Sequence, residues 1–164
     1  MPALILLRHG KSDWQIDYGG DDRARPLARR GRKAAKTVGR FLARSGQVPD
    51  GAITSPAVRA EDTLRRAMKA GGWTCPVRTA GGLYGGGLSG MLAEIRKEPN
   101  TTQLLLAVGH EPTWSEAVTA FIGGGRVEFP TAALARIDFE LDRWEDVHPG
   151  AGVLAWSVPP RLLG

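Results

Sequence analysis

Residues 1–12 read MPALILLRHGKS, and this stretch decides the fold. The run Ala3–Leu7 is apolar without interruption, which is typical of a strand buried on both faces in a parallel sheet. Two polar residues, Arg8 and His9, follow at the point where that strand should end. Ligands of open α/β sheets bind beyond the carboxyl ends of the strands. The stretch therefore predicts both a parallel sheet and the place of a site.

The same alternation of short apolar runs and helical patterns continues along the chain. Further strands are expected at Ala52–Ile53, at Val77 and over Leu104–Val108, with apolar residues at helical spacing between them. Ser55-Pro56 has the residue types of an N-cap and a first helical residue. Two last runs, Ala133–Leu141 and Val153–Val158, have no helix between them and predict an antiparallel hairpin. We expect one α/β domain over residues 1–164: a three-layer sandwich with a mainly parallel central sheet and an antiparallel edge.

The composition excludes several classes of protein. Of the 164 residues, 42% are hydrophobic and 24% are charged, which is ordinary for a globular chain. No apolar run approaches the ~20 residues that cross a bilayer, and no basic segment precedes the first apolar run as in a secretory signal. The only cysteine, Cys75, allows neither a disulfide framework nor a cysteine zinc site. We expect a cytoplasmic protein without a membrane partner.

The net charge of +5 is concentrated in one segment. From Arg23 to Arg44 there are nine basic residues and no acidic one. The segment is either a solvated helix face or a positive rim that attracts an anionic substrate or an acidic partner. Nucleic acid is not favoured, because no aromatic residue is interleaved before Phe41 and no nucleic-acid motif is present.

Polar residues follow three of the expected strands. These stretches are Arg8-His9-Gly10-Lys11-Ser12, Thr54-Ser55-Pro56 with Arg59 shortly after, and Gly109-His110-Glu111-Pro112. Because the carboxyl ends of parallel strands meet at one edge of a sheet, we expect their side chains to come together.

The residue types in these stretches suit phosphoryl transfer. Arginines can orient phosphoryl oxygens through bidentate, charge-assisted hydrogen bonds. A neutral imidazole can attack phosphorus, and a second, protonated imidazole can stabilise the negative charge that spreads over the equatorial oxygens. Since these groups supply a cationic field, neither a metal nor another cofactor is expected.

Three segments carry a resemblance to a known family. LRHGKSDW (7–14) resembles the RHG signature of the histidine phosphatase superfamily, the phosphoglycerate-mutase-like proteins. SPAVRAEDT (55–63) is similar to that family's second arginine segment, and VGHEP (108–112) to its second-histidine segment. The short chain and the run LILLRHGKSDW…RPLARRG most resemble SixA-type phosphohistidine phosphatases.

The resemblance implies a role for each matching position. It makes His9 the phosphorylated nucleophile and His110 the second histidine of the pocket. It also implies phosphate contacts from Arg8, Arg59, Ser12 and Gln15, although Gln15 stands where many relatives have asparagine.

The proton donor to the leaving group is an open question at this stage. The mutase branch of the family carries a glutamate in a loop that corresponds to residues 79–90, where this chain has no acidic residue. The G-x-G-x-x-G match at Gly85–Gly90 lacks a strand directly before it, so it indicates a loop that borders the pocket rather than a dinucleotide site. The next carboxylate, Glu94, is expected to face solvent from a helix. Glu111 is a candidate acid, because another branch places a carboxylate right after its second histidine; the alternative is a helix cap.

The missing acid bears on the substrate. Phosphohistidine leaves as an imidazole, whose pKa is about 6.5, whereas an alkoxide leaving group with a pKa of about 15.7 needs a proton in the transition state. We therefore expect a metal-independent phosphatase that acts on phosphohistidine in a protein. One alternative is a small-metabolite phosphomonoesterase that uses Glu111 as its acid. Another is a non-catalytic phosphate-binding adaptor, which intact His9 and His110 disfavour because binding alone requires no nucleophile.

Overall fold

One six-stranded sheet forms the centre of the molecule, in the strand order β3-β2-β4-β1-β5-β6. In this computed structural model, which describes residues 1–164, β1 pairs in parallel with β4, and β2 pairs in parallel with β3 and β4. The closing hairpin adds β5 antiparallel to β1, and β6 antiparallel to β5. The strands are β1 (Ala3–Arg8), β2 (Gly51–Thr54), β3 (Val77–Thr79), β4 (Leu104–Gly109), β5 (Leu134–Phe139) and β6 (Gly152–Val158). The mainly parallel sheet with an antiparallel edge is confirmed.

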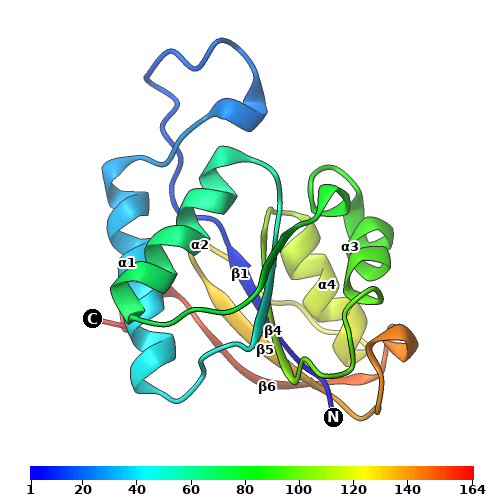
Figure 1. The fold of residues 1–164 in the computed structure, drawn as a ribbon. Coiled ribbons are helices and arrows are strands. Elements are labelled where there is room, and N and C mark those ends of the chain that lie inside the picture. Colours follow the sequence, from blue (N-terminus) through cyan, green and yellow to red (C-terminus); the bar gives the residue numbers. More distant parts are fainter.

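Helices cover both faces of this sheet (Figure 1). Helices α1 and α2 pack on one face and α3 and α4 on the other, which confirms the three layers. None of the helices is long and apolar enough to cross a membrane. The helices are α1 (Arg29–Arg44), α2 (Val58–Gly71), α3 (Gly87–Ile95) and α4 (Thr113–Ile122), with short 3-10 helices η1 (Asp22–Ala24), η2 (Gly81–Leu83), η3 (Trp144–Asp146) and η4 (Pro160–Leu162).

The unbroken apolar run of β1 follows from its position between two cores. Successive side chains of a strand point to opposite faces of the sheet. Leu4 and Leu6 accordingly join the core beneath α3 and α4, while Ile5 and Leu7 join the core beneath α1 and α2. All four are fully buried, so β1 is anchored on both faces and holds the residues that follow it in a fixed place.

Two local expectations were wrong. Helix α2 begins at Val58 with Ala57 as its N-cap, not at Pro56, and the Ser55 hydroxyl accepts the N–H of Ala57, outside the helix, at 3.2 Å. Glu94 does not face solvent: it is buried and forms ion pairs with Arg78 and Lys97. These partners commit Glu94 to packing α3 against the β3 region, away from the strand ends.

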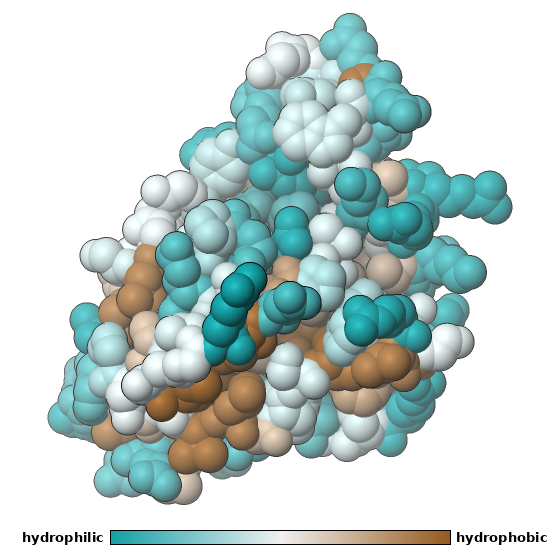
Figure 2. Space-filling model, turned by 180° about the vertical axis from the view of Figure 1, so that it is seen from behind, coloured by the Kyte–Doolittle hydropathy of each residue, from teal (hydrophilic) through white to brown (hydrophobic).

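The segment from Lys11 to Ala28 projects beyond the sheet, as the blue coil at the top of Figure 1. Its base is closed by a bridge between Ser12 and Leu27 and by the Ala28 N–H, which donates to the Lys11 carbonyl at 2.8 Å. Seen from behind in Figure 2, this top of the molecule is mostly hydrophilic, while hydrophobic residues gather lower down. The projecting segment therefore adds polar groups above the strand ends rather than apolar packing.

Candidate active site

The sheet register brings the three polar stretches together. Arg8 at the end of β1 pairs with Gly109 at the end of β4, and Thr54 at the end of β2 pairs with Val108. His9 and His110 follow these ends, and their ring centroids lie 5.1 Å apart. They line a pocket of about 340 Å³, whose other lining residues are Arg8, Lys11, Ser12, Trp14, Arg25, Arg59, Tyr84, Gly85, Glu111 and Thr131.

The His9 ring is held in one tautomer. Its Nδ1 lies 2.7 Å from the carbonyl oxygen of Gly10, which can only accept, so Nδ1 carries the hydrogen and Nε2 keeps its lone pair. Burial lowers the pKa of His9 to about 3; the Gly10 carbonyl opposes this, and the charges of Arg59 and Arg8 add to it. The imidazole is therefore neutral near pH 7, the state required of a nucleophile.

The His110 ring is fixed from the opposite side. Its Nε2 lies 2.7 Å from the Ser55 hydroxyl oxygen. Because that oxygen already accepts the Ala57 N–H, we assign the hydroxyl hydrogen to His110 Nε2, which leaves the ring hydrogen on Nδ1. The buried Nδ1 has no partner in the protein. It is an unused donor of the kind that a phosphoryl oxygen satisfies.

The charge of His110 differs from the sequence-based expectation. Burial, followed by the positive charge of Arg59, lowers the pKa of His110 to about 4, so the ring is neutral near pH 7 in the free protein. The second imidazole is therefore mostly neutral before a substrate binds. A phosphate dianion placed against the ring would raise this pKa, because a nearby opposite charge favours the protonated form.

Two arginines supply fixed positive charge and unused donors. Arg8 Nη1 donates to the Phe129 carbonyl at 2.9 Å, and Arg59 Nη1 and Nη2 donate to the backbone carbonyl and carboxylate of Asp22 at 2.7 and 2.9 Å. The Nε groups of both arginines are buried without a partner. Orientation by the protein together with unmet hydrogen-bonding capacity suits both side chains to an oxyanion.

Asp22, on the projecting segment, is the residue that joins this network, and the sequence analysis missed it. Its carboxylate accepts the Tyr84 hydroxyl at 2.7 Å and forms ion pairs with Arg59 and Arg25. Burial opposes ionisation, but these hydrogen bonds and the charge of Arg59 hold the pKa of Asp22 well below its usual range. Arg25 Nε in turn donates to the Ser12 hydroxyl at 3.0 Å, so Ser12 lines the pocket with its oxygen already bonded.

Two aromatic side chains complete the pocket wall. The Arg25 guanidinium lies 3.5 Å from the centre of the Trp14 ring, and the Tyr84 ring meets His110 edge-on at 5.6 Å. Tyr84 and Gly85, at the start of the glycine-rich stretch, line the pocket as expected, whereas Gly87–Gly90 form the first turn of α3 rather than a loop. The signals for the missed residues were an Asp-Asp pair directly before the basic segment and a tyrosine beside the glycines.

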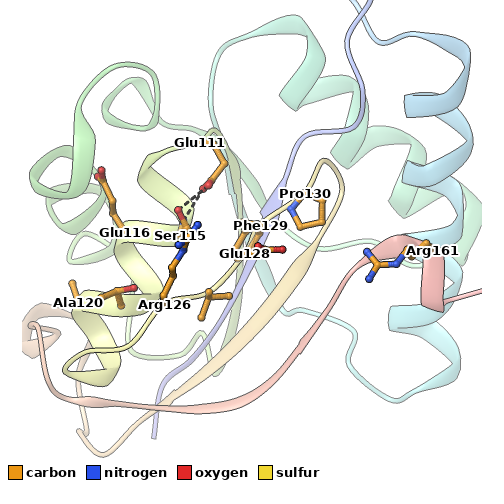
Figure 3. Close-up of a pocket in the computed structure, with 11 residues that line it drawn as sticks. Glu111, Ser115, Glu116, Ala120, Arg126, Glu128, Phe129, Pro130 and Arg161 are labelled. Carbon is orange, nitrogen blue, oxygen red and sulfur yellow. Dashed lines mark hydrogen bonds between the residues drawn. The ribbon is translucent and has the colours of Figure 1, made fainter.

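Two other residues predicted from the sequence, Glu111 and Gln15, remain to be placed. Both carboxylate oxygens of Glu111 are bonded to Ser115, one to its N–H and one to its hydroxyl, each at 2.7 Å (Figure 3). Glu111 thus caps the first turn of α4 while lining the pocket. Gln15 is exposed and is not among the lining residues. No group of three His, Cys, Asp or Glu side chains is placed to hold a metal ion.

Comparison with known proteins decides the family. The model of the histidine phosphatase superfamily (branch 1) matches residues 4–156. The chain belongs to this superfamily. It is a phosphatase that works through a histidine nucleophile.

Relatives of this histidine phosphatase match nearly the whole length of the chain. The uncharacterized protein Rv1276c of Mycobacterium tuberculosis is 34% identical over 165 residues, which cover 94% of this chain and 100% of that protein. A structure from Nakamurella multipartitia, described as the phosphohistidine phosphatase SixA, is 26% identical with a TM-score of 0.79, and covers 97% of this chain and 96% of its own. The mycobacterial glucosyl-3-phosphoglycerate phosphatase Rv2419c shares the fold with a TM-score of 0.69 at 14% identity, over 95% and 98% of the two chains.

Proposed function

We propose that this phosphatase removes the phosphoryl group from phosphohistidine in a protein, through phospho-His9 and without a metal. Nε2 of His9 attacks phosphorus, a bond from phosphorus to His9 forms, and the bond to the substrate imidazole breaks. The other nitrogen of the substrate ring carries a proton before the bond breaks, so the ring leaves as neutral imidazole. A water molecule then attacks phospho-His9, which releases phosphate and restores the Nε2 lone pair.

The other site residues bind and stabilise the phosphoryl group in this proposal. Arg8, Arg59 and His110 line the pocket, and their unpaired donors would bond the oxygens on which negative charge develops. Ser12 acts through Arg25, whose guanidinium it orients. A phosphate contact from Gln15 stays a prediction and requires its side chain to turn inward from its exposed position.

The choice of substrate rests on the hydrogen bonds and ion pairs that the carboxylates near the pocket already form. Glu111 is bonded through both oxygens to Ser115, and Asp22 is an ionised partner of two arginines. Neither is a free carboxylic acid that could protonate an alkoxide. A substrate whose leaving group is an imidazole requires no such acid. The SixA description of the Nakamurella structure supports the same choice.

A leaving-group series tests this proposal. Without a general acid, the rate of phosphorylation of His9 should fall steeply as the leaving-group pKa rises, so phosphohistidine and aryl phosphates react fast and alkyl phosphates slowly. Glu111→Gln should change aryl and alkyl rates by the same small factor. Glu116→Gln is the matched control, because Glu116 is an exposed glutamate in the first turn of the same helix.

Two outcomes favour the other functions. A flat leaving-group dependence that becomes steep in Glu111→Gln would identify a metabolite phosphomonoesterase with Glu111 as acid, since general acid catalysis contributes about 10²–10⁴ in rate. Phosphate binding without turnover of any phosphate ester or phosphohistidine would identify an adaptor. The proposal also places the enzyme in the cytoplasm, in keeping with a chain that has a single cysteine.

A further inference from the structure

A second cavity adjoins the active-site pocket, and the charged side chains that line it are all basic. This cavity, which we call the basic groove, has a volume of about 400 Å³. Its charged side chains are Lys11, Arg30, Lys33 and Arg161, and no Asp or Glu side chain lines it. The groove lies between the first turn of α1 and η4.

The basic groove borders the active-site pocket. Lys11 and Thr131 line both cavities. Figure 3 is a close-up of another pocket, which Glu111, Pro130 and Arg161 line, and it shows Arg161 near α1 with Pro130 between it and Glu111. A group bound in the groove would therefore belong to the same molecule whose phosphoryl group lies against His9, or to a segment of chain a few residues away from it.

The four cations are not used within the protein. Their side chains form no ion pair and no hydrogen bond with protein atoms, whereas Arg32 and Arg44 of the same helix each donate to a backbone carbonyl. Arg30 also lies in the first turn of α1, which contains no acidic residue, and Lys33 follows at the start of the second turn. Positive charge at a helix N-terminus is unfavourable because it meets the positive end of the macrodipole. These charges therefore do not serve the stability of α1.

We propose that the basic groove binds carboxylate side chains of the protein substrate, in the segment that flanks the phosphohistidine. This inference rests on the proposed function. Four unpaired cations attract acidic side chains, and the rings of Pro130, Pro159 and Pro160 give the groove rigid apolar walls against which a peptide packs. The groove would select acidic partners and speed their encounter with the enzyme.

Matched charge variants provide the test. Arg30→Gln/Lys33→Gln removes two charges from the groove, and the control Lys36→Gln/Arg40→Gln removes two exposed charges from the same helix. The substrates are two phosphohistidine peptides, one with two glutamates on each side of the phosphohistidine and one with glutamines there, and an aryl phosphate. We expect the groove variant to lower kcat/KM for the acidic peptide by about five- to tenfold, mainly through KM.

The comparisons between substrates and salt concentrations make the result specific. The groove variant should change the aryl phosphate and the glutamine peptide no more than the control does. Wild-type preference for the acidic peptide should shrink as salt is added, because exposed charge pairs are screened. Equal wild-type kcat/KM for the two peptides, or equal losses in the groove and control variants, would overturn the inference and leave the proposed function standing.

A binding measurement distinguishes a failure of the groove proposal from a failure of the proposed function. The unphosphorylated glutamate peptide should inhibit aryl phosphate turnover in wild type and in the control, and far less in the groove variant. If no phosphohistidine peptide is hydrolysed, the proposed function fails, and this inhibition still reports whether the groove binds carboxylates; its absence refutes the groove as well. A groove-dependent preference for a bisphosphorylated sugar over the monophosphate, without inhibition by the peptide, would show that the groove takes a second phosphate instead.

Discussion

The Ser55 hydroxyl should be essential for the function of His110 although it cannot touch the phosphate-binding Nδ1. Ser55 is fully buried, and Ser55→Ala leaves both His110 Nε2 and the Ala57 N–H without a partner. Such unsatisfied buried groups cost about 1–3 kcal/mol, and we expect the free energy of unfolding to fall by that amount. The ring also loses the contact that holds its hydrogen on Nδ1.

The same free energy, taken from the transition state, corresponds to a loss of about five- to 150-fold in kcat/KM, since each 1.36 kcal/mol is a factor of ten. Turnover of an aryl phosphate measures the rate, and urea unfolding measures stability. Nitrogen-15 NMR of labelled histidine reports which ring nitrogen of His110 carries the hydrogen. Ser45→Ala is the control, because the Ser45 hydroxyl bonds only the Phe41 carbonyl.

One result would refute this reasoning about Ser55. If Ser55→Ala lost stability as expected but kept kcat/KM within twofold of wild type, with the hydrogen of His110 still on Nδ1, the hydroxyl would serve the fold alone. His110 would then take its tautomer from another source.

Three further predictions concern the histidines and the absence of a metal requirement. His9→Ala should abolish turnover and keep the fold, and quenching the wild-type enzyme during turnover should trap acid-labile phosphate on His9; label found only on His110 would reverse the two roles. Extensive chelation should leave the rate unchanged, whereas activity lost to a chelator and restored by a divalent ion would contradict charge compensation by arginine. Because the pKa values of His9 and His110 are about 3 and about 4 in the folded protein against about 6.5 when unfolded, the unfolded chain binds more protons between these values. The free energy of unfolding should therefore decrease as the pH falls from 6.5 toward 4, measured by urea unfolding, and a His9→Ala/His110→Ala variant should show a flatter dependence.

The strands and the outline of the site could be predicted because both follow from local pattern and topology. An unbroken apolar run such as Ala3–Leu7 has few alternatives to a doubly buried strand, and polar residues after parallel strands must meet at one edge of the sheet. The end of α1 also follows a local pattern, since Gly46 adopts a positive φ of 70° just beyond the helix, as glycine often does after a helix.

The polar network could not be predicted because it depends on long-range contacts. Asp22 and Tyr84 are separated by 62 residues and meet only once the projecting segment and the glycine-rich loop are placed over the strand ends. The role of Ser55 was misjudged for a similar reason: its residue type favours an N-cap, but His110 from another strand end competes for the hydroxyl. Capping propensity depends on the segment in which a residue lies, whereas these side chains form hydrogen bonds between distant segments.

The carboxylate of Asp22 has a consequence for how the enzyme releases its product. In the free protein it already occupies one N–H group of Arg59, and the backbone carbonyl of the same residue occupies another. An entering phosphate ion has to share these donors and also meets the negative charge of Asp22. The free energy of phosphate binding is therefore reduced, because phosphate and the Asp22 carboxylate compete for one guanidinium. We expect the affinity for inorganic phosphate to be low, so that turnover continues while phosphate accumulates around the enzyme.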